Sequence, residues 1–180
     1  MTAAPVIHIG GWPGSGKRTI GQTLADLCGG RLLDNHIFLD AACAVFERGT
    51  DECARLREEV RAVVLRAALK LPVQVPVILT DALSDADEDF ALFKPTLDFA
   101  RDRGAPLRAV VLEIDEAENL ARLTHPDRGA FKLIEPAVLT DLRRRLTLLE
   151  PQGAWRLDVT SLTAEAAALR IAEKCGLTHG

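Results

Sequence analysis

The segment that constrains the fold most is a glycine-rich stretch near the N-terminus. It reads Gly11-Trp12-Pro13-Gly14-Ser15-Gly16-Lys17-Arg18-Thr19 and lies between a short apolar run at 6–9 and a helical apolar pattern over 17–28. A strand, a G-x-x-x-x-G-K loop and a helix in this order bind phosphate, because backbone N–H groups and the positive helix end converge there. The sequence therefore predicts a nucleoside triphosphate site, which we expect to hold ATP. Its predicted contacts are Gly11, Pro13, Gly14, Ser15, Gly16, Lys17, Arg18 and Thr19, with the Lys17 charge at the β- and γ-phosphates.

Apolar runs of strand length alternate with helical patterns along the rest of the chain. The expected strands are 6–9, 32–33, 75–79, 107–114 and 155–159, and the expected helices are 17–28, 36–47, 51–71, 85–103, 116–123, 136–149 and 164–175. Asp51 is the expected N-cap of the third helix, and Pro95 is a candidate for a kink in the fourth. This order predicts a doubly wound α/β fold: one domain over 1–180, with a five-stranded parallel sheet and helices on both faces.

Composition and charge limit which binding partners and which cellular compartment we expect. The chain has 180 residues and a net charge of −4, and no run of lysine or arginine suggests a nucleic-acid tract. The N-terminal segment lacks both the basic region and the apolar region of a signal peptide. No apolar run is long enough for a membrane span, so we expect a cytoplasmic protein. The four cysteines form no C-x-x-C pair and are expected to be thiols rather than metal ligands. A monomer and a homodimer both remain open.

One position departs from the usual loop pattern. Arg18 stands where a serine or threonine ordinarily offers its hydroxyl to Mg²⁺, and Thr19 comes one residue late. A guanidinium group has no lone pair for a cation, so this residue cannot be a metal ligand. Three interpretations follow: phosphate and water alone hold Mg²⁺, residues such as Thr19 or Asp81 help through water, or catalysis is impaired.

The loop pattern Gly-x-Pro-Gly-Ser-Gly-Lys-x-Thr resembles the phosphate loop of adenylate kinase, in which the residue after the lysine is glycine rather than a hydroxyl residue. In its order of elements the rest of the chain resembles the small P-loop kinases, namely shikimate kinase, gluconate kinase and chloramphenicol phosphotransferase. The resemblance implies a kinase fold with a short lid. It also implies an acidic residue at the end of the second strand that holds or deprotonates the acceptor hydroxyl.

Asp34 occupies that position. A carboxylate at the carboxyl end of a strand beside a phosphate loop could accept a hydroxyl proton. The alternative is an N-cap for the helix that begins near residue 36. His36 is a second candidate for acceptor contact, or else a polar residue at a helix start, and Asp81 at the end of the third strand is a third candidate.

Arginines complete the predicted site. The pattern Phe46…Arg55-x-x-Glu58 resembles the shikimate kinase segment in which an arginine binds the substrate carboxylate. The resemblance therefore places Arg55, or Arg57 or Arg61 instead, in an acceptor-binding helical region over about 36–71. The alternative is a solvated face with ion pairs such as Arg55 with Glu58. The resemblance also implies a lid over about 122–135, where Arg122 and Arg128 would stabilise the transferring phosphoryl group, with Lys132 as a further candidate. Thr160 and Leu162, after the fifth strand, are the expected adenine contacts.

These patterns predict phosphoryl transfer from ATP to the hydroxyl of a small molecule. The alternative is a nucleotide-binding module or degenerate kinase without transferase activity, which Arg18 suggests. A nucleoside monophosphate kinase is a third possibility, in which Asp34 would have no role as a base. The N-K-x-D motif of a GTPase does not occur in the chain.

Overall fold

The computed structural model describes residues 3–124 and 135–177. Within these residues the strands are β1 Val6–Gly11, β2 Arg31–Asp34, β3 Val77–Thr80, β4 Leu107–Glu113 and β5 Trp155–Asp158. The helices are α1 Lys17–Cys28, α2 Asn35–Cys43, α3 Asp51–Ala68, α4 Asp87–Asp102, α5 Glu116–Leu123, α6 Pro136–Arg145 and α7 Ala164–Cys175.

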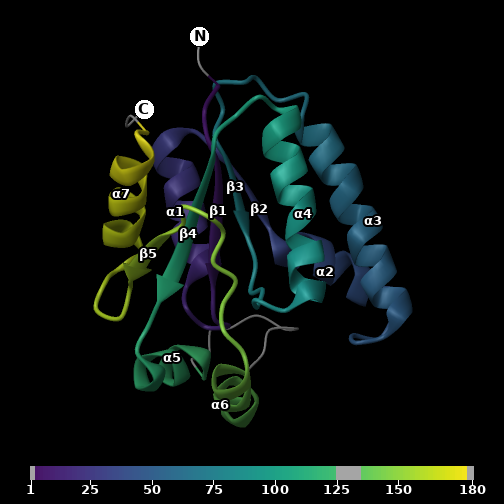
Figure 1. Ribbon diagram of the computed structural model, residues 1–180, viewed down its shortest axis with the longest axis vertical. Coiled ribbons are helices and arrows are strands. Elements are labelled where there is room, and N and C mark those ends of the chain that lie inside the picture. The colour runs from purple at the N-terminus through teal and green to yellow at the C-terminus, as the bar shows by residue number, and fades with distance from the viewer. Residues whose placement is uncertain (1–2, 125–134, 178–180) are drawn as a thin grey trace.

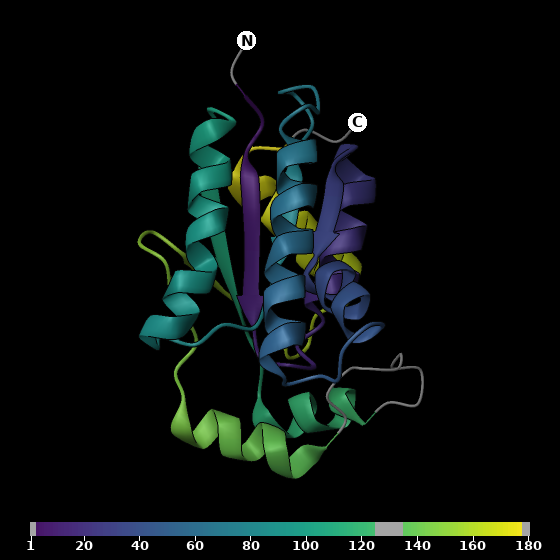
Figure 2. The same cartoon turned by 90° about the vertical axis from the view of Figure 1, so that its right-hand side faces the viewer.

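The five strands form one sheet in the order β2-β3-β1-β4-β5, and every neighbouring pair is parallel. The strand before the glycine-rich loop, β1, is therefore central. Helices cover both faces of the sheet, which confirms the predicted doubly wound α/β fold (Figure 1). The carboxyl ends of all five strands share one edge, and α5 and α6 lie together beyond that edge (Figures 1 and 2). The positions at which ligands bind in such sheets are thus collected at one end of the molecule.

Two apolar layers hold the helices on the sheet, and strand alternation assigns each side chain to its layer. Ile7 and Ile9 of β1 belong to the core shared with α1 and α7, whereas Val6 belongs to the core shared with α3 and α4. Figure 2 shows α3 and α4 in front of the sheet and α7 behind it. His8 lies on the same side as Val6, where its ring makes an edge contact with Phe93 at 4.8 Å between centroids.

Several helices differ in detail from expectation. The N-cap of α3 is Thr50, whose Oγ1 accepts a hydrogen bond from the amide of Cys53, so the prediction of Asp51 as N-cap is wrong. Asp51 lies in the first turn instead, where its negative charge stabilises the helix through the helix dipole. Helix α4 continues through Pro95 as a single element. Helix α2 ends at Cys43 rather than at residue 47.

Helix α6 ends at Arg145, four residues before the predicted end. The segment after it hydrogen-bonds to the loop that follows β3: the amide of Asp85 donates to Thr147 O, and the amide of Leu149 donates to Leu83 O. These tertiary bonds satisfy backbone groups that the helix would otherwise have paired, so the helical pattern of the sequence does not persist.

Candidate functional site

The glycine-rich loop turns back toward α1 between the end of β1 and Gly16. Gly14 and Gly16 have φ of 89° and 90°, the left-handed region that favours glycine. A Cβ on Gly11 would lie 2.8 Å from the Oγ of Ser15, so the loop closes this tightly only with glycine there. Ser15 is fully buried and its hydroxyl has no partner among the described residues. An unpaired buried hydroxyl at the start of a helix suits a ligand with acceptor oxygens.

Two cations border the loop. The Nζ of Lys17 donates to the carbonyls of Gly11 and Trp12 at 2.7 and 2.8 Å, so the charge of the lysine lies over the loop backbone. Arg122 of α5 approaches the loop at Gly16, where its Nη1 would lie 3.9 Å from a Cβ placed on that glycine. The structure therefore brings the predicted Lys17 and Arg122 to the same loop, from sequence positions more than a hundred residues apart.

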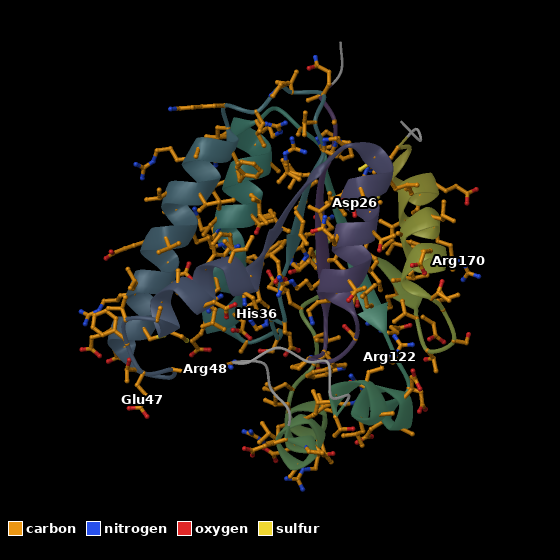
Figure 3. The ribbon with its side chains drawn as sticks, turned by 180° about the vertical axis from the view of Figure 1, so that it is seen from behind. Asp26, His36, Glu47, Arg48, Arg122 and Arg170 are labelled. Carbon is orange, nitrogen blue, oxygen red and sulfur yellow. The ribbon has the colours of Figure 1, made fainter. Side chains whose placement is uncertain are left out.

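Arg122 also links α5 to the segment after β5. Its Nη2 donates to the carbonyls of Val159 and Thr160 at 2.9 and 3.0 Å, and its Nε donates to Glu118 at 2.7 Å. Figure 3 shows Arg122 close to the end of the loop that precedes α1. Thr160, a predicted adenine contact, is held in turn by Asp158 and by the amide of Asp115. The predicted adenine end of the site is thus adjacent to the loop, while Leu162 packs partly buried against the core.

Asp34 lies at the end of β2 and is 4% exposed. It occupies the N-cap position of α2, but its carboxylate makes no capping hydrogen bond. Instead, its Oδ1 accepts from the Oγ1 of Thr80 at the end of β3. Oδ2 has no hydrogen-bond partner among the described residues, and it lies 3.7 Å from the Nε of Arg18. The carboxylate therefore does not serve as a cap, and one oxygen faces the phosphate-loop side of the strand end.

Asp81, one residue beyond β3, is also buried but is held differently. Its Oδ2 lies 2.9 Å from the Nε2 of His8 on the neighbouring strand β1. Burial raises the pKa of Asp81, but the charges of His8, Arg61 and Lys17 outweigh burial and leave the pKa below its ordinary value. The structure thus turns this predicted acceptor contact toward His8, a residue that the sequence analysis did not select.

The predicted arginines of α3 have separate environments. Arg55 is 70% exposed in its side chain and pairs with Glu52 rather than with the expected Glu58. Arg57 is mostly buried beside Glu58. Arg61 is buried and donates to Leu92 O at 2.6 Å and Thr96 Oγ1 at 2.8 Å, so it holds α3 against α4. Of the three, only Arg57 is mostly buried without a described bond to the next helix.

Of the other predicted residues, some are described by the structure and some lie outside the described part of the chain. His36, at the start of α2, lies 3.3 Å from Asp40 through its Nδ1, and it is seen near the end of the sheet in Figure 3. Thr19 is exposed on the first turn of α1. Arg128, Lys132 and most of the predicted lid lie outside the described residues, which resume at residue 135.

Sequence reasoning missed the residues that contact Trp12 and Pro13 of the loop. Asn119 of α5 is fully buried; its Nδ2 donates to the carbonyl of Pro13 at 2.9 Å, and its Oδ1 accepts from Arg143 of α6 at 3.0 Å. The guanidinium carbon of Arg143 lies 5.6 Å from the ring centroid of Trp12. Trp12 and Arg143 border a cavity of about 310 Å³ at the end of β4. The three-arginine run at 143–145 was a visible signal, but nothing in the sequence singled out Asn119.

Direct metal ligands are scarce in the described part of the chain. No group of three or more His, Cys, Asp and Glu side chains there could hold a metal ion. The cysteines in it are free, and Cys43 and Cys53 bring their sulfur atoms to 3.7 Å. None of the described helices is long and apolar enough to cross a membrane.

Solved structures with similar folds span almost the whole chain. A sugar kinase from Janibacter is 20% identical over 97% of this chain and 96% of its own, with a TM-score of 0.64. A tunicamycin resistance protein from Deinococcus radiodurans is 19% identical over 98% of each chain, with a TM-score of 0.65. A shikimate kinase from Acinetobacter baumannii, in complex with shikimate, is 24% identical over 95% of this chain and 92% of its own, with a TM-score of 0.59.

These likenesses establish the fold, because almost every residue of both chains is covered although few are identical. The chain has the fold of the small P-loop kinases, which confirms the resemblance drawn from the loop and the order of elements. No family model matches the sequence, and no curated protein matches it either.

Proposed function

We propose that the chain transfers the γ-phosphoryl group of ATP to a hydroxyl group of a small molecule. The observation that carries this proposal is the carboxylate of Asp34: it is 4% exposed, it caps no helix, and its Oδ2 lacks a hydrogen-bond partner on the loop side of β2. A buried carboxylate of this kind is suited to accept the proton that an attacking hydroxyl group loses.

In this proposal each part of the site has one task. The loop amides and Lys17 bind the phosphates, and Arg122 adds positive charge beside Gly16. The acceptor oxygen attacks the γ-phosphorus, its O–P bond forms as the bond to ADP breaks, and the hydroxyl proton passes to Asp34. We further propose one domain over 1–180, an acceptor-binding region at about 36–71, and a lid at about 122–135 that includes Arg128.

Mg²⁺ ordinarily neutralises phosphate charge in such reactions. At the loop, Arg18 replaces the hydroxyl that ordinarily binds the metal, and one of the two carboxylate oxygens of Asp81 is engaged by His8. We therefore propose that the ion arrives as a complex with ATP and is held through phosphate and water.

The first test is a screen of sugars, other metabolite alcohols, nucleosides and aminoglycosides for a phosphorylated product. Lys17→Ala should abolish ATP turnover, because the lysine charge at the phosphates is lost. Lys94→Ala is the matched control, since Lys94 is exposed on α4 and forms an ion pair with Asp98 of the same helix. Turnover in the Lys17→Ala protein equal to wild type would end the proposal.

A second candidate is a nucleotide-binding module without transferase activity. The observation in its favour is Arg18, whose Nε lies 3.7 Å from the oxygen of Asp34 that would serve as the base. Tight binding of ATP with no product from any acceptor class would favour this candidate, and detection of product would exclude it. A nucleoside monophosphate kinase is less well supported, because its phosphate acceptor gives Asp34 no proton to remove.

A further inference from the structure

Two residues outside the glycine-rich motif hold the front of the phosphate loop. Trp12 and Pro13 are the second and third residues of the loop, and each is contacted by a side chain from beyond the carboxyl edge of the sheet. Asn119 contacts Pro13, and Arg143 contacts Trp12. We call Trp12, Pro13, Asn119 and Arg143 the loop clamp.

Asn119 is the centre of the loop clamp. It is fully buried, and both ends of its amide are used: Nδ2 donates to Pro13 O at 2.9 Å, and Oδ1 accepts from Arg143 Nη1 at 3.0 Å. A buried amide is costly unless it is fully hydrogen-bonded, so this geometry is specified rather than incidental. Pro13 has no N–H of its own, and its carbonyl is therefore the group through which its position is controlled.

Arg143 supplies the second contact. Its guanidinium carbon lies 5.6 Å from the centroid of Trp12, and its Nη2 donates to the carbonyl of Ile114, just beyond β4, at 3.2 Å. The planar fork of arginine thus reaches Asn119, the end of the sheet and the Trp12 ring at once, which lysine cannot do. The described partners of Arg143 are the oxygen atoms of Asn119 and Ile114 and the ring of Trp12.

We propose that Asn119 and Arg143 are positioning residues that preorganise the loop for the phosphates of the nucleotide. The inference rests on the proposed function for its ligand, but the loop clamp is defined by contacts of the described residues alone. Lys17 also bonds to Trp12 O, so a displaced Trp12 would disturb the loop and its lysine together. Preorganisation reduces the ordering cost of binding, and its loss should weaken affinity without removing any contact to the ligand.

The chain contains a matched control for the cation–ring contact. Lys174 of α7 lies 5.8 Å from the ring centroid of Trp155, the first residue of β5. This pair is at the amino end of its strand, whereas the loop clamp is at the carboxyl end of the sheet. Lys174→Gln therefore removes a contact of the same kind from a part of the molecule where no phosphate is expected to bind.

The experiment uses the full chain with Trp155→Phe, so that fluorescence reports Trp12 alone. Arg143→Gln, Arg143→Lys and Asn119→Leu are compared by acrylamide quenching of Trp12 and by calorimetric titration with a non-hydrolysable ATP analogue. Arg143→Gln should expose Trp12 to the quencher and raise the Kd about tenfold, a loss of about 1.4 kcal/mol. Asn119→Leu should do the same, although its side chain is fully buried and cannot touch a ligand. Arg143→Lys should recover part of the affinity.

Lys174→Gln, made with Trp155 in place, should leave analogue binding unchanged. Wild-type affinity and wild-type quenching of Trp12 in Arg143→Gln would overturn the inference. A folded Asn119→Leu protein that keeps wild-type affinity, while Arg143→Gln loses affinity, would also overturn it. If the unmutated chain fails to bind the analogue, the proposed function fails instead. In that case quenching of Trp12 in the nucleotide-free proteins still decides whether the loop clamp holds the loop.

Discussion

Two neighbouring strand ends, those of β2 and β3, each carry a buried aspartate, and the two aspartates have different partners. Asp34 accepts one hydrogen bond from Thr80, its nearest cation is the exposed Arg18 at 3.7 Å, and its Oδ2 is otherwise unpartnered. Asp81 is paired at 2.9 Å with His8, a buried residue of the adjacent strand. Each carboxylate thus has one oxygen without a hydrogen-bond partner among the described residues, but that of Asp34 lies beside the exposed Arg18 of the phosphate loop, whereas Asp81 is held by the buried His8. The comparison teaches that burial alone does not assign a role.

The largest expected effect is on catalysis at the β2 end. Asp34→Asn keeps an oxygen for the Thr80 bond but removes the base, so kcat should fall about 10³-fold while affinity for an ATP analogue stays near wild type. Steady-state kinetics with the acceptor found in the screen, together with calorimetric titration, provide the measurement.

Asp115→Asn is the control for that experiment, because Asp115 also follows a strand but caps α5 through the amides of Ala117 and Glu118. It should retain kcat and a stability close to that of wild type, because asparagine is as good an N-cap as aspartate. A wild-type kcat in Asp34→Asn would remove the distinction between the two strand ends.

At the β3 end the expected effect is on stability. Asp81→Asn removes the buried carboxylate that contacts His8 and interacts with the charge of Arg61, and loss of one partner from a buried pair of this kind costs about 3 kcal/mol in the free energy of unfolding. Urea denaturation followed by circular dichroism measures this loss. Asp26→Asn, on the exposed face of α1, should change stability very little; an equally small change in Asp81→Asn would contradict the role assigned to Asp81.

The same pair predicts a dependence on pH. The pKa of Asp81 in the folded protein lies below its ordinary value of 3.8, so the stabilisation is complete well above that value and is lost as pH falls below it toward the folded pKa. The difference in unfolding free energy between wild type and Asp81→Asn should therefore shrink as the pH falls through this acidic range. Parallel curves for the two proteins down to the acid limit would count against the pairing.

The smallest expected effect concerns the bond between the two strand ends. Thr80→Val removes the hydroxyl that donates to Asp34 and keeps the shape of the side chain. It should cost about 1 kcal/mol of stability, because a buried acceptor loses a partner. It should also lower kcat much less than Asp34→Asn, since the carboxylate itself remains. A loss of kcat as large as that of Asp34→Asn would mean that the two residues act as one unit.

Local signals account for what could be predicted. The glycines and Lys17 mark the phosphate loop, strand-length apolar runs mark β1 to β5, and Asp34 follows one of those runs. Helix ends were less predictable: α6 stops at Arg145 because the loop after β3 pairs with the next residues, and such pairing leaves no trace in helical periodicity.

By itself the sequence determined the alternation of strands and helices, the phosphate loop and the acidic residue at the end of β2, because each depends on residues within one short segment. Only the tertiary structure decided the order β2-β3-β1-β4-β5, and with it the contacts of Asp34 with Thr80, of Asp81 with His8, and of the loop with Asn119 and Arg143. These partners are 46 to 131 residues apart or lie on separate strands. Buried polar pairs have no periodicity in the sequence, so their identity follows from how the parallel crossovers place the strand ends side by side.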